Sequence, residues 1–285
     1  MTHRSSRRFE SERSTDRALI APSAAIYQCP MVSIEHGMPA STAVRNPRRV
    51  SDKRIAILQS AYIPWKGYFD IIGSVDIFVV YDDVQYPQKG HWHNRNLIKT
   101  QHGPKWLTVP VSKADGSFQN IDALQLPLPF LDKHWQSITN AYARAPYYKT
   151  FGPKLESLYK AAATFTHLSD LNRHFLTALA SHLGFDTQFV LSRELTAGGA
   201  KTDRLLGICR ELGATRYLSG PAAKAYLETD KFDAANVQVE WMDYSGYPTY
   251  PQLHGSFDPG VSVIDLLFNT GDNARDFMKA PLSRT

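Results

Sequence analysis

Residues 55–83 read IAILQSAYIPWKGYFDIIGSVDIFVVYDD, with two short apolar runs on either side of a loop and a helix-like segment. The runs at 55–58 and 77–81 are rich in β-branched residues, which favour buried strands. Between them, Pro64 and Gly67 mark a loop, and residues 68–72 have a helical pattern. Strand, helix and strand in this order predict a βαβ unit with a parallel strand pair.

Further segments of both kinds follow along the chain. Strands are expected at 106–111, 188–191, 216–219 and 237–241, with a weaker one at 121–126. Helices are expected at 135–159 with breaks at Pro146 and Pro153, at 169–182, from the cap Thr202 to 212, and at 263–268 after the cap Ser262. The sequence therefore predicts an α/β fold whose mostly parallel sheet has βαβ units and a helical insertion.

The chain divides into a basic N-terminal segment, one domain and a short C-terminal tail. Residues 1–54 hold ten basic against five acidic residues, which is the whole net charge of +5. Residues 1–53 lack a sustained apolar period, so we predict a disordered basic tail or a mispredicted start, with Met31 or Met38 as later start residues. The folded domain is expected at 54–275, and the C-terminal tail at 276–285.

Composition excludes several classes of function. The remaining residues balance 22 bases against 22 acids, so the global positive field of a nucleic-acid-binding protein is absent. No run approaches the roughly 18 apolar residues of a membrane span, and we expect a cytoplasmic protein with no membrane span. Cys29 and Cys209 do not form a CxxC pair, so neither a disulfide framework nor a zinc site is predicted.

Candidate ligand-binding residues lie in the loop of the βαβ unit. Ligands of parallel sheets bind beyond the carboxyl ends of the strands, where Gln59 follows the first strand. The loop residues Pro64, Gly67 and Tyr68 resemble a nucleotidyltransferase pattern in which a Pro and a Gly-His pair precede a helix. Tyr68 stands where the His of that pair binds phosphate, and this departure argues against nucleotidyl transfer. The alternative is that Pro64 and Gly67 only shape a tight turn and Tyr68 packs in the core.

Two adjacent carboxylates end the second strand. Alternation along a strand sends Asp82 and Asp83 in different directions, so at most one of them faces the site. A carboxylate at this position can hold Mg²⁺, accept a hydrogen bond from a sugar hydroxyl or act as a general base. Gln85 and Tyr86 add polar groups beside the pair. The structural alternative is a turn-forming Asp after a strand.

Residues 91–96, HWHNRN, are the densest polar and aromatic cluster in the chain. Arg95 can bind a phosphate or carboxylate through two parallel hydrogen bonds, Asn94 can contact a sugar or an amide, and His93 can transfer protons near neutral pH. His91 and His93 have the alternate spacing of metal ligands on a strand. No third ligand lies at a helpful spacing, so no metal site is predicted.

A second candidate anion site combines a helix start with a Gly-bearing turn. Ser219 and Gly220 end a strand, Lys224 follows four residues later, and Thr202 begins the preceding helix. The same residues are also ordinary helix and turn formers. Ser219 lacks a Gly-x-Ser-x-Gly elbow, so we do not predict a nucleophilic serine.

The residues of seven separated stretches resemble the WbqC-like family. They are 57–59 (ILQ) with Pro64 and 67–69 (GYF), 81–86 (YDDVQY), 94–96 (NRN), 106–111 (WLTVPV), 212–214 (LGA), 217–221 (YLSGP) and Ser262 with 265–269 (DLLFN) and Gly271. The resemblance covers most of residues 54–271. It implies a cytoplasmic protein encoded with O-antigen or other surface-polysaccharide genes, and it implies no particular reaction.

From the resemblance and the residues together, the leading hypothesis is an enzyme that transfers a group onto a nucleotide-activated amino sugar. Asp83, Asp82 and His93 are its candidate catalytic residues, and its candidate ligand-binding residues are Gln59, Pro64, Gly67, Tyr68, Gln85, Asn94, Arg95, Ser219, Gly220 and Lys224. The expected partner is a small-molecule substrate, a nucleotide sugar, and no cofactor is specified by the sequence. The alternatives are a nucleotidyltransferase-like enzyme and a non-catalytic binding or scaffold protein of a polysaccharide assembly complex.

Overall fold

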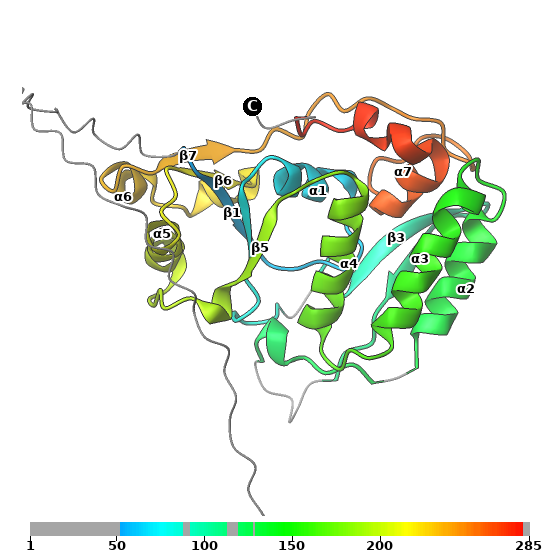
Figure 1. Ribbon diagram of the computed structural model, residues 1–285, viewed down its shortest axis with the longest axis horizontal. Coiled ribbons are helices and arrows are strands. Elements are labelled where there is room, and N and C mark those ends of the chain that lie inside the picture. The colour runs from blue at the N-terminus through cyan, green and yellow to red at the C-terminus, as the bar shows by residue number, and fades with distance from the viewer. Residues whose placement is uncertain (1–51, 88–91, 113–118, 128, 282–285) are drawn as a thin grey trace, which may run out of the picture. The chain divides into compact units, whose positions relative to one another are not determined.

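A computed structural model describes residues 52–87, 92–112, 119–127 and 129–281, and it confirms the α/β fold with a mostly parallel sheet (Figure 1). The five strands of the main sheet are all parallel. Their spatial order is β5 (Gln188–Leu191), β2 (Ile77–Val80), β1 (Arg54–Leu58), β6 (Arg216–Ser219) and β7 (Gln238–Trp241). Except for Asp52 and Lys53, the tail expected at residues 1–53 lies outside the described residues.

The central strands supply a core to each face of the sheet. In β1, Ile55 and Ile57 belong to one core and Ala56 to the other, as the strand period of two requires. The first core contains buried residues of α5 (Lys201–Glu211) and α6 (Thr229–Asp233), and the second contains those of α1 (Lys66–Gly73) and α4 (Leu168–His182). A strand that is buried on both faces reads as a continuous apolar run, which is the signal at 55–58.

The helical insertion lies between β2 and β5 in the sequence. Its helices are α2 (Leu131–Tyr142), α3 (Tyr148–Ala162) and α4, and α3 also packs against α7 (Val263–Thr270) near the C-terminus (Figure 1). The expected break at Pro146 is confirmed, but the break at Pro153 is wrong because α3 continues through it. The buried residues Phe151, Leu155 and Tyr159 offset the lost hydrogen bond. No helix in the described ranges is long and apolar enough to cross a membrane.

A separate antiparallel hairpin was not predicted. It pairs β3 (Arg95–Thr100) with β4 (Gly103–Thr108) and forms a two-stranded sheet of its own. The sequence placed a strand at 106–111 and gave residues 91–96 no secondary structure. The turn needs Gly103, whose φ of 101° is a conformation that other residues rarely adopt.

Short 3-10 helices complete the fold. They are η2 (Ile121–Ala123), η3 (Ser192–Glu194), η4 (Pro221–Ala225) and η5 (Gly271–Phe277). The strand expected at 121–126 is therefore wrong. Thr202 is not the cap of α5, because Ala200 holds that position and the Thr202 hydroxyl accepts a bond from the Glu228 amide. Ser262 is the cap of α7, as predicted, and its hydroxyl also donates to the Ile63 carbonyl at 2.6 Å.

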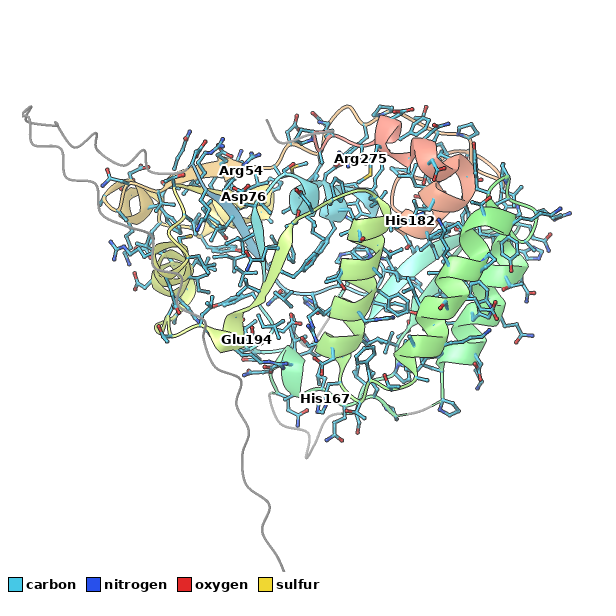
Figure 2. The ribbon with its side chains drawn as sticks, viewed as in Figure 1. Arg54, Asp76, His167, His182, Glu194 and Arg275 are labelled. Atoms are coloured by element: carbon cyan, nitrogen blue, oxygen red, sulfur yellow. The ribbon has the colours of Figure 1, made fainter. Side chains whose placement is uncertain are left out.

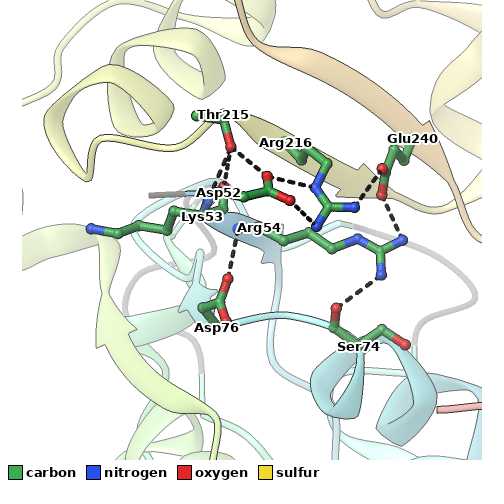
Figure 3. Close-up of polar contacts among 8 residues, drawn as sticks. All are labelled: Asp52, Lys53, Arg54, Ser74, Asp76, Thr215, Arg216 and Glu240. Atoms are coloured by element: carbon green, nitrogen blue, oxygen red, sulfur yellow. Dashed lines mark hydrogen bonds and ion pairs between the residues drawn. The ribbon is translucent and has the colours of Figure 1, made fainter. Parts of the chain in front are cut away.

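Ion pairs and hydrogen bonds join the strands at the amino-terminal edge of the sheet (Figure 3). Arg54 of β1 binds Glu240 of β7 at 2.5 Å, and its amide donates to the Asp76 carboxylate at 2.7 Å. Arg216 of β6 binds Asp52 at 2.6 Å. This edge is therefore occupied by contacts within the fold. Figure 2 has Arg54 and Asp76 close together at this edge and Glu194, which follows β5, at the other end of the sheet.

We expect Gly73→Ala to lower the free energy of unfolding by about 2 kcal/mol, because overpacking a filled core usually costs 1–3 kcal/mol. Gly73 ends α1, and a Cβ there would lie 2.1 Å from Cε1 of Phe185. Urea unfolding followed by circular dichroism measures the change. The control is Gly198→Ala, where a Cβ meets no atom within 4 Å. Equal stability of the two variants would contradict the packing at Gly73.

Candidate functional site

A cavity of about 750 Å³ lies at the carboxyl-terminal ends of β1 and β6. Its wall takes residues from both strands, from the loop before α1, from the start of α5 and from η4. This is where ligands bind in parallel α/β sheets, and the volume is within the usual range of about 300–1,000 Å³ for small-molecule sites.

The wall is mainly apolar and aromatic, with a few polar side chains. The aromatic residues are Trp65, Tyr68, Tyr81, Trp92, Tyr217 and Tyr226. Among the described residues that line the cavity there is no Asp or Glu, and Lys201 is the one formally charged residue. His93, Asn96, Gln59 and Ser219 add polar groups. The cavity is therefore suited to a ligand that combines flat or apolar parts with negative charge.

Six of the candidate residues from the sequence line this cavity. They are Gln59, Pro64, Tyr68, His93, Ser219 and Gly220. The other candidates, which are Gly67, Asp82, Asp83, Gln85, Asn94, Arg95 and Lys224, do not line it. The first and second halves of the chain meet here because β1 pairs with β6, which brings the loop after β1 beside the turn after β6.

His93 is held in one orientation in the cavity wall. Its Nδ1 lies 2.8 Å from the Ser60 carbonyl oxygen, and a carbonyl only accepts, so Nδ1 carries the proton. The lone pair of the neutral ring is then on Nε2. Burial lowers the pKa of His93, against the opposing effects of the Ser60 carbonyl and Asp82. The imidazole is therefore neutral at physiological pH, which is the state that a general base requires.

Asp82 is buried, and both of its carboxylate oxygens accept hydrogen bonds from within the fold. One carboxylate oxygen accepts from the Ser60 amide at 2.7 Å, and the other accepts from the Ser169 hydroxyl at 2.5 Å. Ser60 is thus bonded to Asp82 through its amide and to His93 through its carbonyl. Asn172 adds bonds to the Ser60 hydroxyl at 2.9 Å and to the His93 carbonyl at 2.8 Å. The arrangement suits Asp82 to positioning His93 through the Ser60 peptide rather than to contact with a ligand.

Asp83 points elsewhere, and the expectation that the two carboxylates end the strand is wrong, because β2 ends at Val80. Its carboxylate forms an ion pair with Arg204 of α5 and accepts from the Ser192 hydroxyl at 2.5 Å. The Arg204 guanidinium also lies 5.1 Å from the centre of the Tyr81 ring. Because Tyr81 lines the cavity, the pair braces the wall from outside.

The candidates of the hairpin region lie beyond the cavity. The Asn94 side-chain amide donates to the Val109 carbonyl at 2.9 Å and accepts from the Tyr86 hydroxyl at 3.0 Å. It therefore joins the two ends of the hairpin to each other and to Tyr86. Arg95 lies over the Trp106 ring, 4.5 Å from its centre. Gln85 is exposed and forms a bridge with Asn120. His91 lies outside the described residues.

Two further candidates are placed by packing. At Gly67, a Cβ would lie 2.4 Å from the Trp65 indole, so the glycine lets Trp65 reach the cavity wall. The Lys224 ammonium lies 5.6 Å from the centre of the Trp241 ring, away from the cavity lining.

Sequence reasoning missed several lining residues. Asn96 belongs to the polar cluster at 91–96, but the sequence does not distinguish it from its neighbours. In the structure it lines the cavity and is only 1% exposed, so the fold holds its side chain in place. Lys201 is the first residue of α5 and follows Gly198 and Gly199 closely in the sequence. Two glycines before a basic residue near the expected helix start were a usable signal. Ala222 and Tyr226 had no such signal because they follow an ordinary turn.

The site has an acid–base group but no evident metal centre. No group of three or more His, Cys, Asp or Glu residues able to hold a metal ion occurs within the described ranges. Cys209, the cysteine that the structure describes, is buried, and burial raises its pKa to about 12. It is therefore unreactive. His93 is the lining residue best suited to proton transfer.

Comparison with known proteins gives one family and one curated relative. A model described as the WbqC-like protein family matches residues 59–277. The uncharacterized protein Rv1507c of Mycobacterium tuberculosis is 41% identical over 228 residues, which are 80% of this chain and 98% of that protein. No solved structure matches the chain significantly. The matched residues include most of the cavity wall.

Proposed function

The chain belongs to the WbqC-like protein family, and from that premise we propose that it binds a nucleotide-activated amino sugar in the cavity and transfers an acyl group to the amine. The reaction would decorate a precursor of O antigen or another bacterial surface polysaccharide. The observation that carries the proposal is the cavity of about 750 Å³, which has no carboxylate among its described lining residues and includes both Lys201 and His93.

The ligand class follows from size and charge. A nucleotide sugar has a flat base, a diphosphate and a polar ring, and this combination needs aromatic walls, positive charge and a few hydrogen-bonding groups. Trp65, Tyr68 and Tyr81 offer the aromatic surface, and Lys201 offers a positive charge. A carboxylate in the wall would repel the diphosphate, and the described lining has none.

His93 is the proposed proton acceptor of the transfer. The amine nitrogen attacks the acyl carbon of an activated donor, and the bond between that carbon and the leaving atom breaks with its electron pair on the leaving atom. The proton released by the amine goes to Nε2 of His93. Burial lowers the pKa of His93, so the ring stays neutral until the pH falls below the ordinary pKa of a histidine. Turnover would therefore fall only below that ordinary pKa.

Filling part of the cavity should weaken this binding. We expect Ala222→Trp to weaken the affinity for nucleotide sugars at least about tenfold, because an indole at an exposed lining position occupies ligand space without disturbing the core. The measurement is calorimetric titration of UDP-, GDP- and dTDP-linked amino sugars. The matched control is Ala225→Trp, an exposed position in the same short helix that does not line the cavity.

The same assays separate the alternatives. Equal affinity of both tryptophan variants and the parent protein for every nucleotide sugar would contradict the proposed site. Metabolite-dependent release of pyrophosphate would point instead to a nucleotidyltransferase, against which stands the Tyr68 hydroxyl, bonded to the Gln59 carbonyl at 2.7 Å. A His93→Gln protein that still supports normal polysaccharide in cells would point to a binding or scaffold role.

A further inference from the structure

Two tryptophans are exposed beside the cavity. The side chains of Trp92 and Trp106 are 51% and 42% exposed, and their ring centres are 5.5 Å apart. Together with Tyr226, they are the exposed large apolar side chains of the described residues. An indole that stays in water does not gain the free energy that burial of its apolar surface provides. Two adjacent exposed indoles therefore indicate a surface that binds a ligand or partner.

The pair is continuous with the cavity. Trp92 itself lines the cavity, and its carbonyl accepts a bond from the Tyr62 amide at 3.3 Å. Trp106 lies on β4 of the hairpin, where its register partner on β3 is Leu97. Because the two ring centres are 5.5 Å apart, a ligand that extends from the cavity along Trp92 can also contact Trp106.

A positive charge accompanies the aromatic pair. The Arg95 guanidinium lies 4.5 Å from the centre of the Trp106 ring, a cation–π distance. In the part of the chain that the structure describes, no carboxylate forms an ion pair with Arg95. Its planar fork of donors is thus held on an indole and is suited to two oxygens of one anion.

We propose that Trp92, Trp106 and Arg95 form a subsite for the pyranose ring of an anionic sugar derivative. The subsite rests on the proposed function, because it extends the same cavity. The C–H face of a pyranose is apolar and lies flat on an indole, while Arg95 pairs with a phosphate or carboxylate attached to the ring. The cavity then holds the rest of the molecule. A membrane surface is a different partner for exposed indoles, but the shared wall at Trp92 favours a ligand continuous with the cavity.

The test uses saturation-transfer NMR and titration of the whole protein with defined probes. The probes are N-acetylglucosamine, N-acetylglucosamine 1-phosphate, glucuronic acid, UDP and UDP-N-acetylglucosamine. We expect Trp106→Ala to weaken binding of the sugar 1-phosphate about tenfold, from loss of the stacking surface, and to leave UDP binding unchanged, because Trp106 does not line the cavity. The control in the same hairpin is His102→Ala at an exposed turn position.

Arg95→Lys separates charge geometry from stacking. We expect it to weaken the two anionic sugars about tenfold and to leave neutral N-acetylglucosamine unchanged, because lysine keeps the charge but loses the bidentate geometry. Comparison of the affinities for glucuronic acid and for N-acetylglucosamine 1-phosphate shows whether the subsite prefers a carboxylate or a phosphate. A lower melting temperature with unchanged sugar binding would mean that Arg95 only packs on the hairpin, and would overturn its assignment.

The outcomes distinguish this subsite from the proposed function. Sugar binding that depends on Trp106 without any binding of UDP would support the subsite and remove the nucleotide from the proposed function. UDP binding with no loss of sugar affinity in Trp106→Ala would overturn the subsite alone. No saturation transfer to any sugar, together with Trp106-dependent binding to anionic lipid vesicles, would assign the pair to a membrane instead. No binding of any probe would overturn both proposals.

Discussion

Asp82→Ala is expected to lower the free energy of unfolding by about 3 kcal/mol. The side chain is 3% exposed, and its removal leaves the buried Ser60 amide and Ser169 hydroxyl without their acceptor. An unsatisfied buried donor costs about 1–3 kcal/mol, so two such donors account for the expected loss. Denaturant unfolding measures it. The His93 ring should also become less ordered, because the Ser60 peptide that bonds it loses its contact with Asp82 and keeps only the Asn172 bond to the Ser60 hydroxyl.

Asp82→Asn provides the sharper comparison. The amide oxygen of asparagine can still accept from the Ser60 amide, and the Ser169 hydroxyl can turn to accept from the new amide nitrogen. We therefore expect most of the stability and most of the turnover to remain. An asparagine variant that is stable but inactive would show instead that the carboxylate acts on the substrate. The control is the exposed Asp132→Asn in the first turn of α2.

Protonation of His134 in acid is expected to lower the free energy of unfolding by about 3 kcal/mol. Its Nε2 lies 3.2 Å from the Thr108 carbonyl, and its Nδ1 lies 3.0 Å from the Tyr62 hydroxyl, which in turn contacts the Tyr159 hydroxyl at 2.6 Å. The neutral ring donates to Thr108 and accepts from Tyr62. Burial, followed by the nearby charge of Lys105, lowers the pKa of His134 from 6.5 to about 4.

Acid destabilises the fold because the pKa of His134 is lower in the folded protein than in the unfolded chain. Because the folded pKa lies below the unfolded value, the unfolded chain binds more protons between pH 6.5 and 4. The stabilising contribution is complete above pH 6.5 and is lost as the pH falls to about 4, at about 1.36 kcal/mol for each pKa unit. Unfolding midpoints across this range measure the loss. His134→Gln should reduce the acid dependence by that amount, and His102→Gln, in the exposed hairpin turn, should not. An unchanged acid profile in His134→Gln would refute the assignment.

The parallel sheet was predictable because its strands carry local signals. Residues 55–58 and 77–80 are short apolar runs with β-branched side chains, and each is buried on both faces. The β3–β4 hairpin was predicted only in part, because the strand expected at 106–111 overlaps the end of β4 and no strand was expected for β3. Its first strand begins in the polar cluster, and in β4 only Leu107 is buried, so the usual alternation is missing. Pro153 also misled the prediction, because burial of neighbouring residues outweighed a local propensity.

The cavity was partly predictable for a topological reason. Because parallel strands end at one edge, Gln59 and Ser219 were each predicted to bind a ligand, but in two separate sites that the structure joins in one cavity. The sequence did not show which carboxylates are already bonded. Asp82 and Asp83 have the composition of a catalytic pair, but their partners Ser169, Ser192 and Arg204 come from distant parts of the chain. Such partners appear only when the chain is folded.

The strand order also determines when during synthesis the cavity can exist. The first strand β1 is central, and its neighbour β6 comes from the last third of the chain; the Lys53 amide and the Thr215 hydroxyl that join there are 162 residues apart. A ribosome releases β1 and β2 long before β6 and β7, and contacts of such sequence separation form slowly. The nascent chain therefore exposes one edge of its central strand until β6 has emerged. The cavity wall is complete only after Pro259 and Gly260, which also line it, have emerged and folded.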